Sequence, residues 1–151
     1  MVFVDTGGWI AVAEPADTYH DVAKPYYERL LMRRIPMFTS NYVIDETMTR
    51  IRYDAGHNQA CRFYDLYEKA EDRRLITTLW VDEDIARQAW QIFGKYSDQK
   101  LSFTDCTSFV ICKNCFKVNK EFVIPNVEHI ALKAFTAPLV HLFVSSSFQN
   151  R

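Results

Sequence analysis

Three acidic residues stand where an apolar stretch meets the start of a helix-like pattern. They are Asp5 in VFVDTGGWIA, Glu46 in FTSNYVIDETMTRI and Asp105 in LSFTDCTSFVI. Hard cations such as Mg²⁺ bind carboxylate oxygens, and carboxylates brought together from distant segments repel one another unless a cation or proton lies between them. The three acids therefore indicate an oxygen-ligand metal site, and such a site commonly acts on phosphate esters.

Strand-like and helix-like segments alternate along the chain and position these acids. Short apolar runs predict strands at residues 2–4, 37–39, 75–81 and 122–124, and amphipathic patterns predict helices at 9–14, 18–31, 41–55, 58–70 and 84–93, with another opening at Ser102 or Thr104. This alternation implies parallel strands, right-handed crossovers and a three-layer α/β sandwich with a central, mainly parallel sheet. Sites in such sheets lie beyond the carboxyl ends of the strands, which is where the three acids are expected.

Several helix boundaries have expected signals of their own. Ser40 and Asp82 are expected to cap the helices that follow them, and Asp17 or Thr18 is expected to cap the second helix. Pro25 is expected to kink that second helix.

Glu46 has two interpretations. Glu46 and Arg50 are spaced i to i+4 on a predicted helix, which is the spacing of a surface ion pair worth only a few tenths of a kcal/mol. A carboxylate in the first two turns of a helix also benefits from the helix dipole, which lowers the cost of keeping it ionised near other acids. Position alone leaves the two interpretations level.

The composition is that of an ordinary soluble protein with one core. The chain has 151 residues, 48% of them hydrophobic and 25% charged, so we expect a single domain over residues 1–151. No apolar run approaches the roughly 20 residues of a membrane span, and the N-terminus lacks the pattern of a signal peptide, so we expect a cytoplasmic protein without membrane association. A formal net charge of -1 means that any polyanion must be bound by local basic patches.

The four cysteines are irregularly spaced and favour a reducing compartment. They are Cys61, Cys106, Cys112 and Cys115. Cys112 and Cys115 form a CxxC pair that could be half of a zinc site or a redox pair, but no second CxxC or His pair stands at finger-like spacing. We interpret the four as structural thiols.

Three segments together resemble a known family. VDTGGWIAVAE, TSNYVIDETMTRIR and YSDQKLSFTDCTSFVI are similar to segments of PIN-domain ribonucleases, specifically the VapC toxins of bacterial and archaeal toxin–antitoxin pairs. The similarity is close over residues 1 to 111 and resumes in EHIALKAF, so residues 1–135 match the family and residues 136–151 form an atypical C-terminal tail. The resemblance implies a PIN-like α/β sandwich that cleaves RNA phosphodiester bonds as an endoribonuclease with Mg²⁺ or Mn²⁺.

The resemblance also implies roles for particular residues and partners. Asp5, Glu46 and Asp105 match the family's first three acids and are expected to be catalytic and to hold the metal, with polar support from Thr6, Asp98 and Thr104. The basic residues expected to hold RNA are Arg50, Arg52, Arg73 and Arg74. A cognate small antitoxin is expected to neutralise the protein. We also expect a homodimer, because an aromatic content of 15% suggests apolar surface that a partner covers.

The sequence departs from the family pattern after residue 111. The family presents a fourth acid after the last core strand, whereas the chain reads EFVIPNVEHIALKAF there. Aligned from the left, the position is Asn126; aligned from the right, it is Val127; neither is an acid, although Glu128 could compensate.

Two other classes of function remain open on the sequence. A degenerate PIN fold would bind RNA or protein without cleaving it. A phosphatase-like hydrolase with an aspartyl nucleophile would place a second Asp two residues after Asp5, where this chain has Gly7.

Overall fold

The computed structural model describes the backbone of residues 1–118 and the side chains of residues 1–115. Along the chain the elements are β1 (Val2–Phe3), α1 (Thr6–Ala13), α2 (His20–Met32), β2 (Met37–Ser40), α3 (Asn41–Asp54), α4 (His57–Asp72), β3 (Ile76–Leu79), α5 (Glu83–Lys95) and α6 (Phe103–Val118). The strand predicted at 122–124, the positions Asn126, Val127 and Glu128, and the tail at 136–151 lie outside the described residues.

The three strands form one parallel sheet in the order β1-β2-β3. Val2 pairs with Met37, and Met37 pairs in turn with Ile76, so the central strand is β2. Each strand is connected to the next through two helices, as parallel pairing requires. The predicted α/β architecture with a parallel sheet is confirmed.

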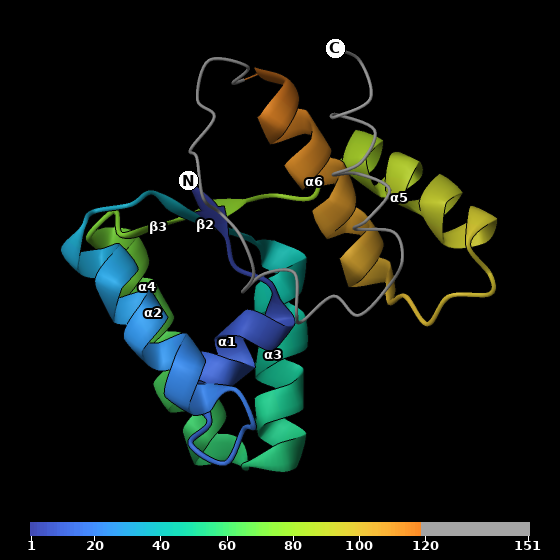
Figure 1. The fold of residues 1–151 in the computed structure, drawn as a ribbon. Coiled ribbons are helices and arrows are strands. Elements are labelled where there is room, and N and C mark those ends of the chain that lie inside the picture. The colour runs from blue at the N-terminus through green and yellow to red at the C-terminus, as the bar shows by residue number, and fades with distance from the viewer. Residues whose placement is uncertain (119–151) are drawn as a thin grey trace.

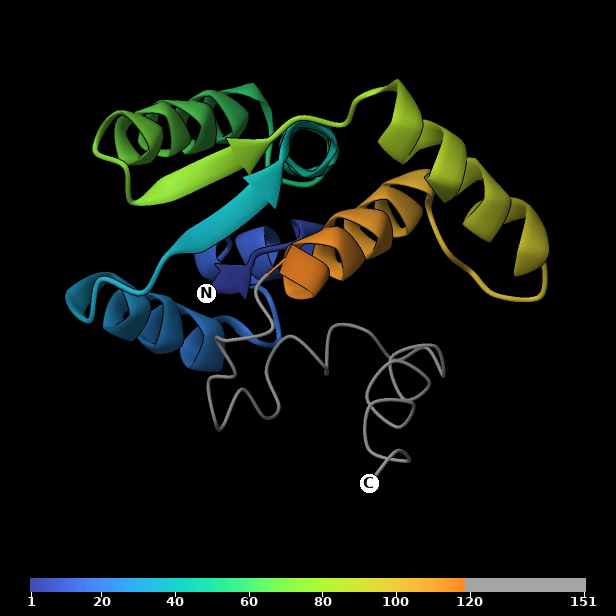
Figure 2. The ribbon, with the colours of Figure 1, turned by 90° about the horizontal axis from the view of Figure 1, so that it is seen from above.

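The helices divide into two groups around this sheet (Figure 1). Helices α1 to α4 gather below the strands, whereas α6 lies to the right of them, at the end where β2 and β3 finish, with α5 outside it. The view from above shows the same order from the strands to α6 and then α5 (Figure 2). The carboxyl ends of the strands therefore face α6.

The main core lies among the strands and the helices α1 to α4. Trp9 is central to it, because its ring contacts Tyr27 and Phe63 edge-on with centroids 5.8 and 5.9 Å away. The Trp9 indole Nε1 donates a hydrogen bond of 3.1 Å to Thr39 Oγ1, which donates in turn to the Val4 carbonyl at 3.0 Å. These bonds satisfy buried polar groups and connect α1, β2 and the end of β1.

A second, smaller core lies between α5 and α6. It consists of Ala89, Cys106 and Val110, with Ile85, Ile92, Leu101 and Phe103 packed against it. Helix α5 is therefore held chiefly by α6.

The helix boundaries agree with the sequence signals at two places and differ at one. Ser40 caps α3 and Asp82 caps α5, each by accepting a backbone N–H bond, as predicted. The prediction for α2 is wrong, because Tyr19 occupies the N-cap and makes no side-chain cap bond. Asp17 instead accepts a hydrogen bond from the Tyr19 N–H, which closes a turn just before the helix. The helix then continues through Pro25.

Within residues 1–118, no helix combines the length and apolar character that crossing a membrane would require.

Candidate active site

Asp5 is positioned by the turn between β1 and α1. Its backbone is extended, with φ −89° and ψ −179°, and its Oδ1 accepts a 2.7 Å hydrogen bond from the Gly8 N–H as the N-cap of α1. A Cβ atom on Gly8 would lie 3.1 Å from that same oxygen and 3.2 Å from Val4 Cγ1. Glycine at position 8 therefore lets the helix start closely against the acid.

Glu46 is held across two helices by a threonine. Thr6, the first residue of α1, donates a hydrogen bond of 2.6 Å from its Oγ1 to Glu46 Oε2 on α3. The ion pair that the i to i+4 spacing suggested between Glu46 and Arg50 is absent, because the salt bridges among the described residues join only Arg87 to Glu83 and Asp84. That interpretation of the spacing is wrong.

Asp105 is fixed by a reciprocal pair of hydrogen bonds at the start of α6. Its Oδ2 accepts from the Ser102 N–H at 2.8 Å, and Ser102 Oγ accepts from the Asp105 N–H at 3.1 Å. This is the geometry of a capping box, and it places the carboxylate in the first turn, where backbone amides favour an anion.

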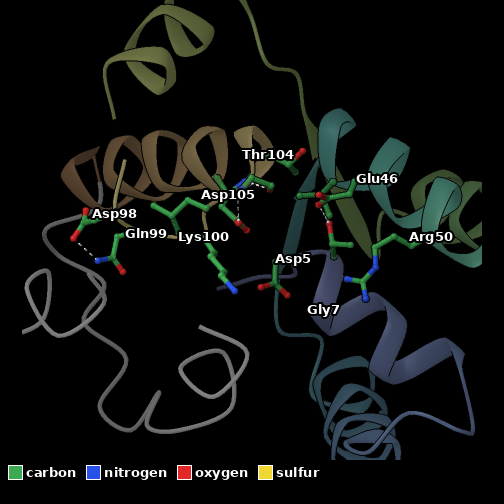
Figure 3. A pocket seen from close by; sticks show the side chains of 14 residues that line it. Asp5, Gly7, Glu46, Arg50, Asp98, Gln99, Lys100, Thr104 and Asp105 are labelled. Carbon is green, nitrogen blue, oxygen red and sulfur yellow. Dashed lines mark hydrogen bonds between the residues drawn. The ribbon is translucent and has the colours of Figure 1, made fainter. Parts of the chain in front are cut away.

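The three acids face one cavity of about 610 Å³. Figure 3 shows Asp5, Glu46 and Asp105 entering this space from the β1–α1 turn, α3 and α6, with Arg50 and Lys100 at its sides. The structure therefore brings together residues that are 40 or more positions apart in sequence.

The electrostatics of the cavity are dominated by Asp5. Burial raises the pKa of Asp5 above its ordinary value, the charges of Asp105 and Glu46 raise it further, and the hydrogen bond from Gly8 opposes the rise. Because the charges of Asp105 and Glu46 disfavour ionisation of Asp5, a cation placed between the acids would favour the ionised form of Asp5.

Carboxylate oxygens are suitable ligands for a hard divalent cation, but the carboxylates lie too far apart to bind one ion together. Among the described residues, no group of three or more His, Cys, Asp or Glu side chains lies near enough together to hold a metal ion. Glu46 and Asp105 are each turned to a protein donor instead. Each of these bonds uses one oxygen of its carboxylate, Oε2 of Glu46 and Oδ2 of Asp105, and the three carboxylates must move closer together to share one ion.

Comparison with known proteins places this arrangement in a family. Residues 2–114 match the PIN domain family. The chain is 33% identical over 117 residues to the 23S rRNA-specific endonuclease VapC20 from two strains of Mycobacterium tuberculosis, in an alignment that covers 75% of this chain and 81% of the relative. This chain belongs to the VapC group of PIN-domain ribonucleases.

A solved structure supports the same assignment. The crystal structure of Mycobacterium tuberculosis VapC20, described as a sarcin–ricin loop cleaving toxin, is similar to this chain with a TM-score of 0.65 and 28% identity. The similarity covers 76% of this chain and 83% of that one.

The supporting residues predicted for a VapC protein lie around the same cavity. Thr6 is buried and binds Glu46, and Thr104 lines the cavity beside Asp105. Asp98 also lines it, from the connection between α5 and α6, where its Oδ2 accepts a hydrogen bond of 3.0 Å from Gln99. The structure therefore places all three predicted neighbours on the lining of the acid cavity, and Thr6 in direct contact with Glu46.

The four predicted RNA-binding arginines do not form one patch. Arg50 lines the acid cavity, whereas Arg73 lines a second cavity between α1, α2 and α4. Arg52 is exposed on α3 and lines neither cavity. Arg74 follows α4 and has a φ of 55°, a left-handed conformation that is common just after the end of a helix. Of the four, Arg50 is the one beside the acids.

Sequence reasoning did not single out Lys100, which lines the cavity from the connection between α5 and α6. The signal was available, because this lysine directly precedes the LSFTD motif and so had to lie near Asp105.

The cysteines of α6 are buried or half-buried thiols. Burial raises the pKa of Cys112 to about 12, with smaller contributions from Cys115 and Asp5, and burial raises the pKa of Cys106 to about 11. All four cysteines are free. A thiol with so high a pKa forms little thiolate at neutral pH, so these groups suit packing better than nucleophilic chemistry.

Proposed function

We propose that this chain is a toxin-type endoribonuclease that hydrolyses RNA phosphodiester bonds with Mg²⁺ or Mn²⁺ in the cytoplasm and is neutralised by a cognate antitoxin. The observation that carries the proposal is the convergence of Asp5, Glu46 and Asp105 on one cavity that also contains Arg50 and Lys100. A cavity lined by acids alone would repel a phosphodiester, and the positive side chains of Arg50 and Lys100 offset that repulsion.

Seven residues of the cavity have proposed roles in this chemistry. Asp5, Glu46 and Asp105 would hold the cation, which when bound supplies polarisation of a water and stabilisation of charge on the departing oxygen. Thr6 orients Glu46, and the Ser102 amide orients Asp105. Arg50 and Lys100 attract the phosphates flanking the scissile bond, in contacts that weaken as salt rises.

The substrate class follows from the relative. VapC20 is named for 23S rRNA and for its sarcin–ricin loop. We propose structured ribosomal RNA as the first substrate to examine for this chain.

The decisive experiment incubates the purified protein with total cellular RNA and with intact ribosomes, with Mg²⁺ or with EDTA, and maps the new ends. Discrete Mg²⁺-dependent ends that disappear for Asp105→Asn support the proposal. An unchanged RNA profile for the wild-type protein in every condition would overturn it.

A non-cleaving RNA-binding or protein-binding PIN fold is the second candidate, and one observation favours it. No three acids among the described residues are close enough to share a metal ion, and the aligned position of the family's fourth acid is Asn126 or Val127. This candidate predicts RNA or protein capture by the purified chain with no cleavage at any Mg²⁺ or Mn²⁺ concentration.

The second cavity supports the proposal of an antitoxin partner. It has a volume of about 610 Å³ and apolar walls that include Trp9, Tyr27 and Leu66, and Lys24 and Arg62 are among its basic lining residues. Leu66 is 64% exposed, an unusual state for a leucine facing a groove. An amphipathic helix with an acidic flank has the matching shape and charge.

Two measurements test the proposed partners. Co-expression of the adjacent small reading frame should rescue growth and co-purify with the chain, and Leu66→Asp should abolish both effects. Light scattering of the toxin alone should give the mass of a homodimer, and a monomer mass would contradict the proposed dimer.

A further inference from the structure

Ser108 is a buried serine on α6 whose hydroxyl has no hydrogen-bond partner among the described residues. It is 3% exposed, and it lines the acid cavity. In the part of the chain whose side chains are described, every buried or half-buried side-chain oxygen or nitrogen that solvent cannot reach has a partner. The Ser108 Oγ has none, so it is an atom that solvent reaches, and the space that it opens into is the acid cavity.

The neighbouring hydroxyl on α6 is satisfied within the helix. Thr107 is fully buried, and its Oγ1 donates a 2.8 Å hydrogen bond to the Thr104 carbonyl. Serine and threonine in helices often bond to the preceding turn in this way. Ser108 makes no such bond, although the same carbonyl lies four residues before it. Because a buried hydroxyl without a partner lowers stability, a ligand in the cavity is the expected partner of Ser108.

Ser108 lies on the side of α6 that meets Asp5. Asp105 is three residues before it and Cys112 is four residues after it, so the three side chains share one side of the helix. Burial raises the pKa values of Asp5 and Cys112, and smaller contributions come from the charge of Asp105 on Asp5 and from the charge of Asp5 on Cys112. Asp5 is therefore near both ends of this stretch, and Figure 3 shows it beneath α6 in the cavity that Asp105 enters. Ser108, in the middle of the stretch, faces Asp5 across the cavity.

Each carboxylate beside Ser108 has one oxygen bonded to a backbone amide. The Gly8 N–H donates to Oδ1 of Asp5, and the Ser102 N–H donates to Oδ2 of Asp105. The second oxygen of each carboxylate can accept a donor from the cavity, and a serine hydroxyl can donate one hydrogen bond and accept two. A small ligand that donates to a carboxylate and also bonds to the hydroxyl would satisfy both groups at once.

The charges around Ser108 favour water over a phosphate oxygen as this ligand. A phosphate oxygen at Ser108 would lie beside Asp105 and opposite Asp5, where like charges repel. The positive side chains of the cavity, Arg50 and Lys100, come instead from α3 and from the connection between α5 and α6. Water is neutral, and a buried water molecule typically makes about three hydrogen bonds to polar groups that lack other partners.

We propose that Ser108 and Asp5 together hold one water molecule in the acid cavity and that this molecule attacks the RNA phosphate. The inference rests on the proposed endoribonuclease function and assigns to it a residue that orients the attacking water. A water held at two points attacks phosphorus from a fixed direction, which is the contribution of Ser108.

The reaction is a hydrolysis with a simple proton balance. The water oxygen forms a bond to phosphorus, and the bond from phosphorus to the departing ribose oxygen breaks. One water proton passes to Asp5 and from there to solvent, and the departing oxygen takes up a proton from solvent.

Kinetics of two substitutions test the role of Ser108. Ser108→Ala removes the hydroxyl, whereas Ser108→Thr keeps it. Ser108→Ala should lower kcat about 10- to 100-fold and leave KM unchanged, because orientation of the water acts on the chemical step and not on RNA binding. Ser108→Thr should recover most of kcat. The melting temperature of Ser108→Ala should not fall, since alanine favours a helix and removes a hydroxyl that the fold does not use.

Thr107→Val provides the matched control. It removes the neighbouring hydroxyl of α6, which is bonded within the helix and does not line the acid cavity. This variant should keep the kcat and KM of the wild type, and any effect should appear in the melting temperature alone.

Two further measurements do not depend on cleavage. In a crystal structure of the metal-free protein, an ordered water should lie about 3 Å from both the Ser108 Oγ and a carboxylate oxygen of Asp5, and it should be missing in Ser108→Ala. The affinity for fluorescein-labelled decauridine, measured by anisotropy in EDTA, should be the same for both proteins, because Ser108 does not bind a phosphate.

The possible results separate this inference from the proposed function. Wild-type cleavage with an unchanged kcat in Ser108→Ala overturns the role of Ser108 and leaves the nuclease in place. Weaker decauridine binding and a raised KM in Ser108→Ala, with kcat unchanged, would assign the hydroxyl to a phosphate and overturn the water. A wild-type protein that never cleaves overturns the nuclease and the attacking role together, whereas a wild-type crystal without the water overturns this inference alone.

Discussion

Asp5 combines a structural role with a costly charge. Its Oδ1 caps α1 through the Gly8 N–H, and its carboxylate is half-buried near two other acids that raise its pKa. Asparagine keeps the cap oxygen and removes the charge, so the substitution isolates the electrostatic part.

We predict that Asp5→Asn stabilises the metal-free protein and abolishes cleavage. A folded-state pKa above the ordinary value means that Asp5 favours folding when protonated and that this benefit is lost as pH rises through the raised pKa. The gain in melting temperature in EDTA should therefore be largest at neutral pH and vanish in acid. Cleavage should fall by about 100-fold or more, as for loss of one charge-stabilising group.

Asp5→Ala provides the matched comparison for this prediction. It removes the charge and also the cap, which is worth about 1 kcal/mol, so it should be less stable than Asp5→Asn. A metal-free Asp5→Asn protein that melts below the wild type at neutral pH would contradict the electrostatic argument.

Thr6 is a positioning residue for Glu46. We predict that Thr6→Val, which keeps the shape and removes the 2.6 Å hydrogen bond, lowers kcat by about 10- to 100-fold, the range typical of partners that orient a metal ligand. Thr6→Ser should recover most of the rate because it keeps the hydroxyl. Equal kcat for the valine and serine variants would show that the bond to Glu46 has no part in the reaction.

At the scale of elements, the sequence predicted those features that depend on neighbours in the chain. Ser40 and Asp82 were identifiable as caps because each is a short polar residue directly before an amphipathic run. The start of α2 could not be identified in this way. The Asp17 side chain accepts a hydrogen bond within a turn, and Tyr19 is the N-cap residue. The hydrogen-bond partner of Glu46 could not be predicted either, because Thr6 lies 40 residues away in the sequence. Glu46 binds Thr6 and forms no ion pair with Arg50, its neighbour on the same helix.

The two caps should differ in the extent of structure that they stabilise. Ser40 is fully buried and begins α3, which packs on α1, α4 and α6, whereas Asp82 is exposed and begins α5, which is held chiefly by α6. We predict that Ser40→Ala lowers the free energy of global unfolding by about 1 kcal/mol. Asp82→Ala should mainly speed hydrogen exchange of the α5 amides, because a weakly anchored helix opens locally.

Chemical denaturation and amide exchange measured on both variants would decide this point. If each substitution changes the amide exchange rates of α3 and α5 by the same factor, the two helices unfold as one unit and the prediction is wrong.

At the scale of the whole molecule, the alternation of strands and helices was enough to predict a parallel sheet with the acids at its carboxyl edge. It could not predict how near the carboxylates come to one another, because that depends on rotamers set by Thr6 and Ser102. The alternation also could not predict which arginine lies near the acids. Arg50 and Arg73 are both in helical sequence patterns, but they line different cavities. Metal binding is thus still a prediction for this chain.

Mg²⁺ should stabilise the folded protein through the acid cavity. An ion that binds only the folded state adds about 1.4 kcal/mol at tenfold its dissociation constant, and here it also relieves repulsion among Asp5, Glu46 and Asp105. We predict that the melting temperature rises with Mg²⁺ beyond the effect of NaCl at equal ionic strength. The rise should shrink as pH falls, because protons compete for Asp5, whose pKa lies above its ordinary value.

Differential scanning fluorimetry of three proteins tests this without any measurement of cleavage. The Mg²⁺-specific rise should be present in the wild type, lost in Asp105→Asn, and retained in Asp65→Asn, which removes an equal charge from an exposed position on α4. Asp105→Asn keeps an oxygen that can accept the Ser102 amide bond, so a lost response reports the charge and not the fold of α6. A wild-type melting temperature that responds identically to Mg²⁺ and NaCl would mean that the acids do not gather a cation, and would favour a PIN fold that binds without cleaving.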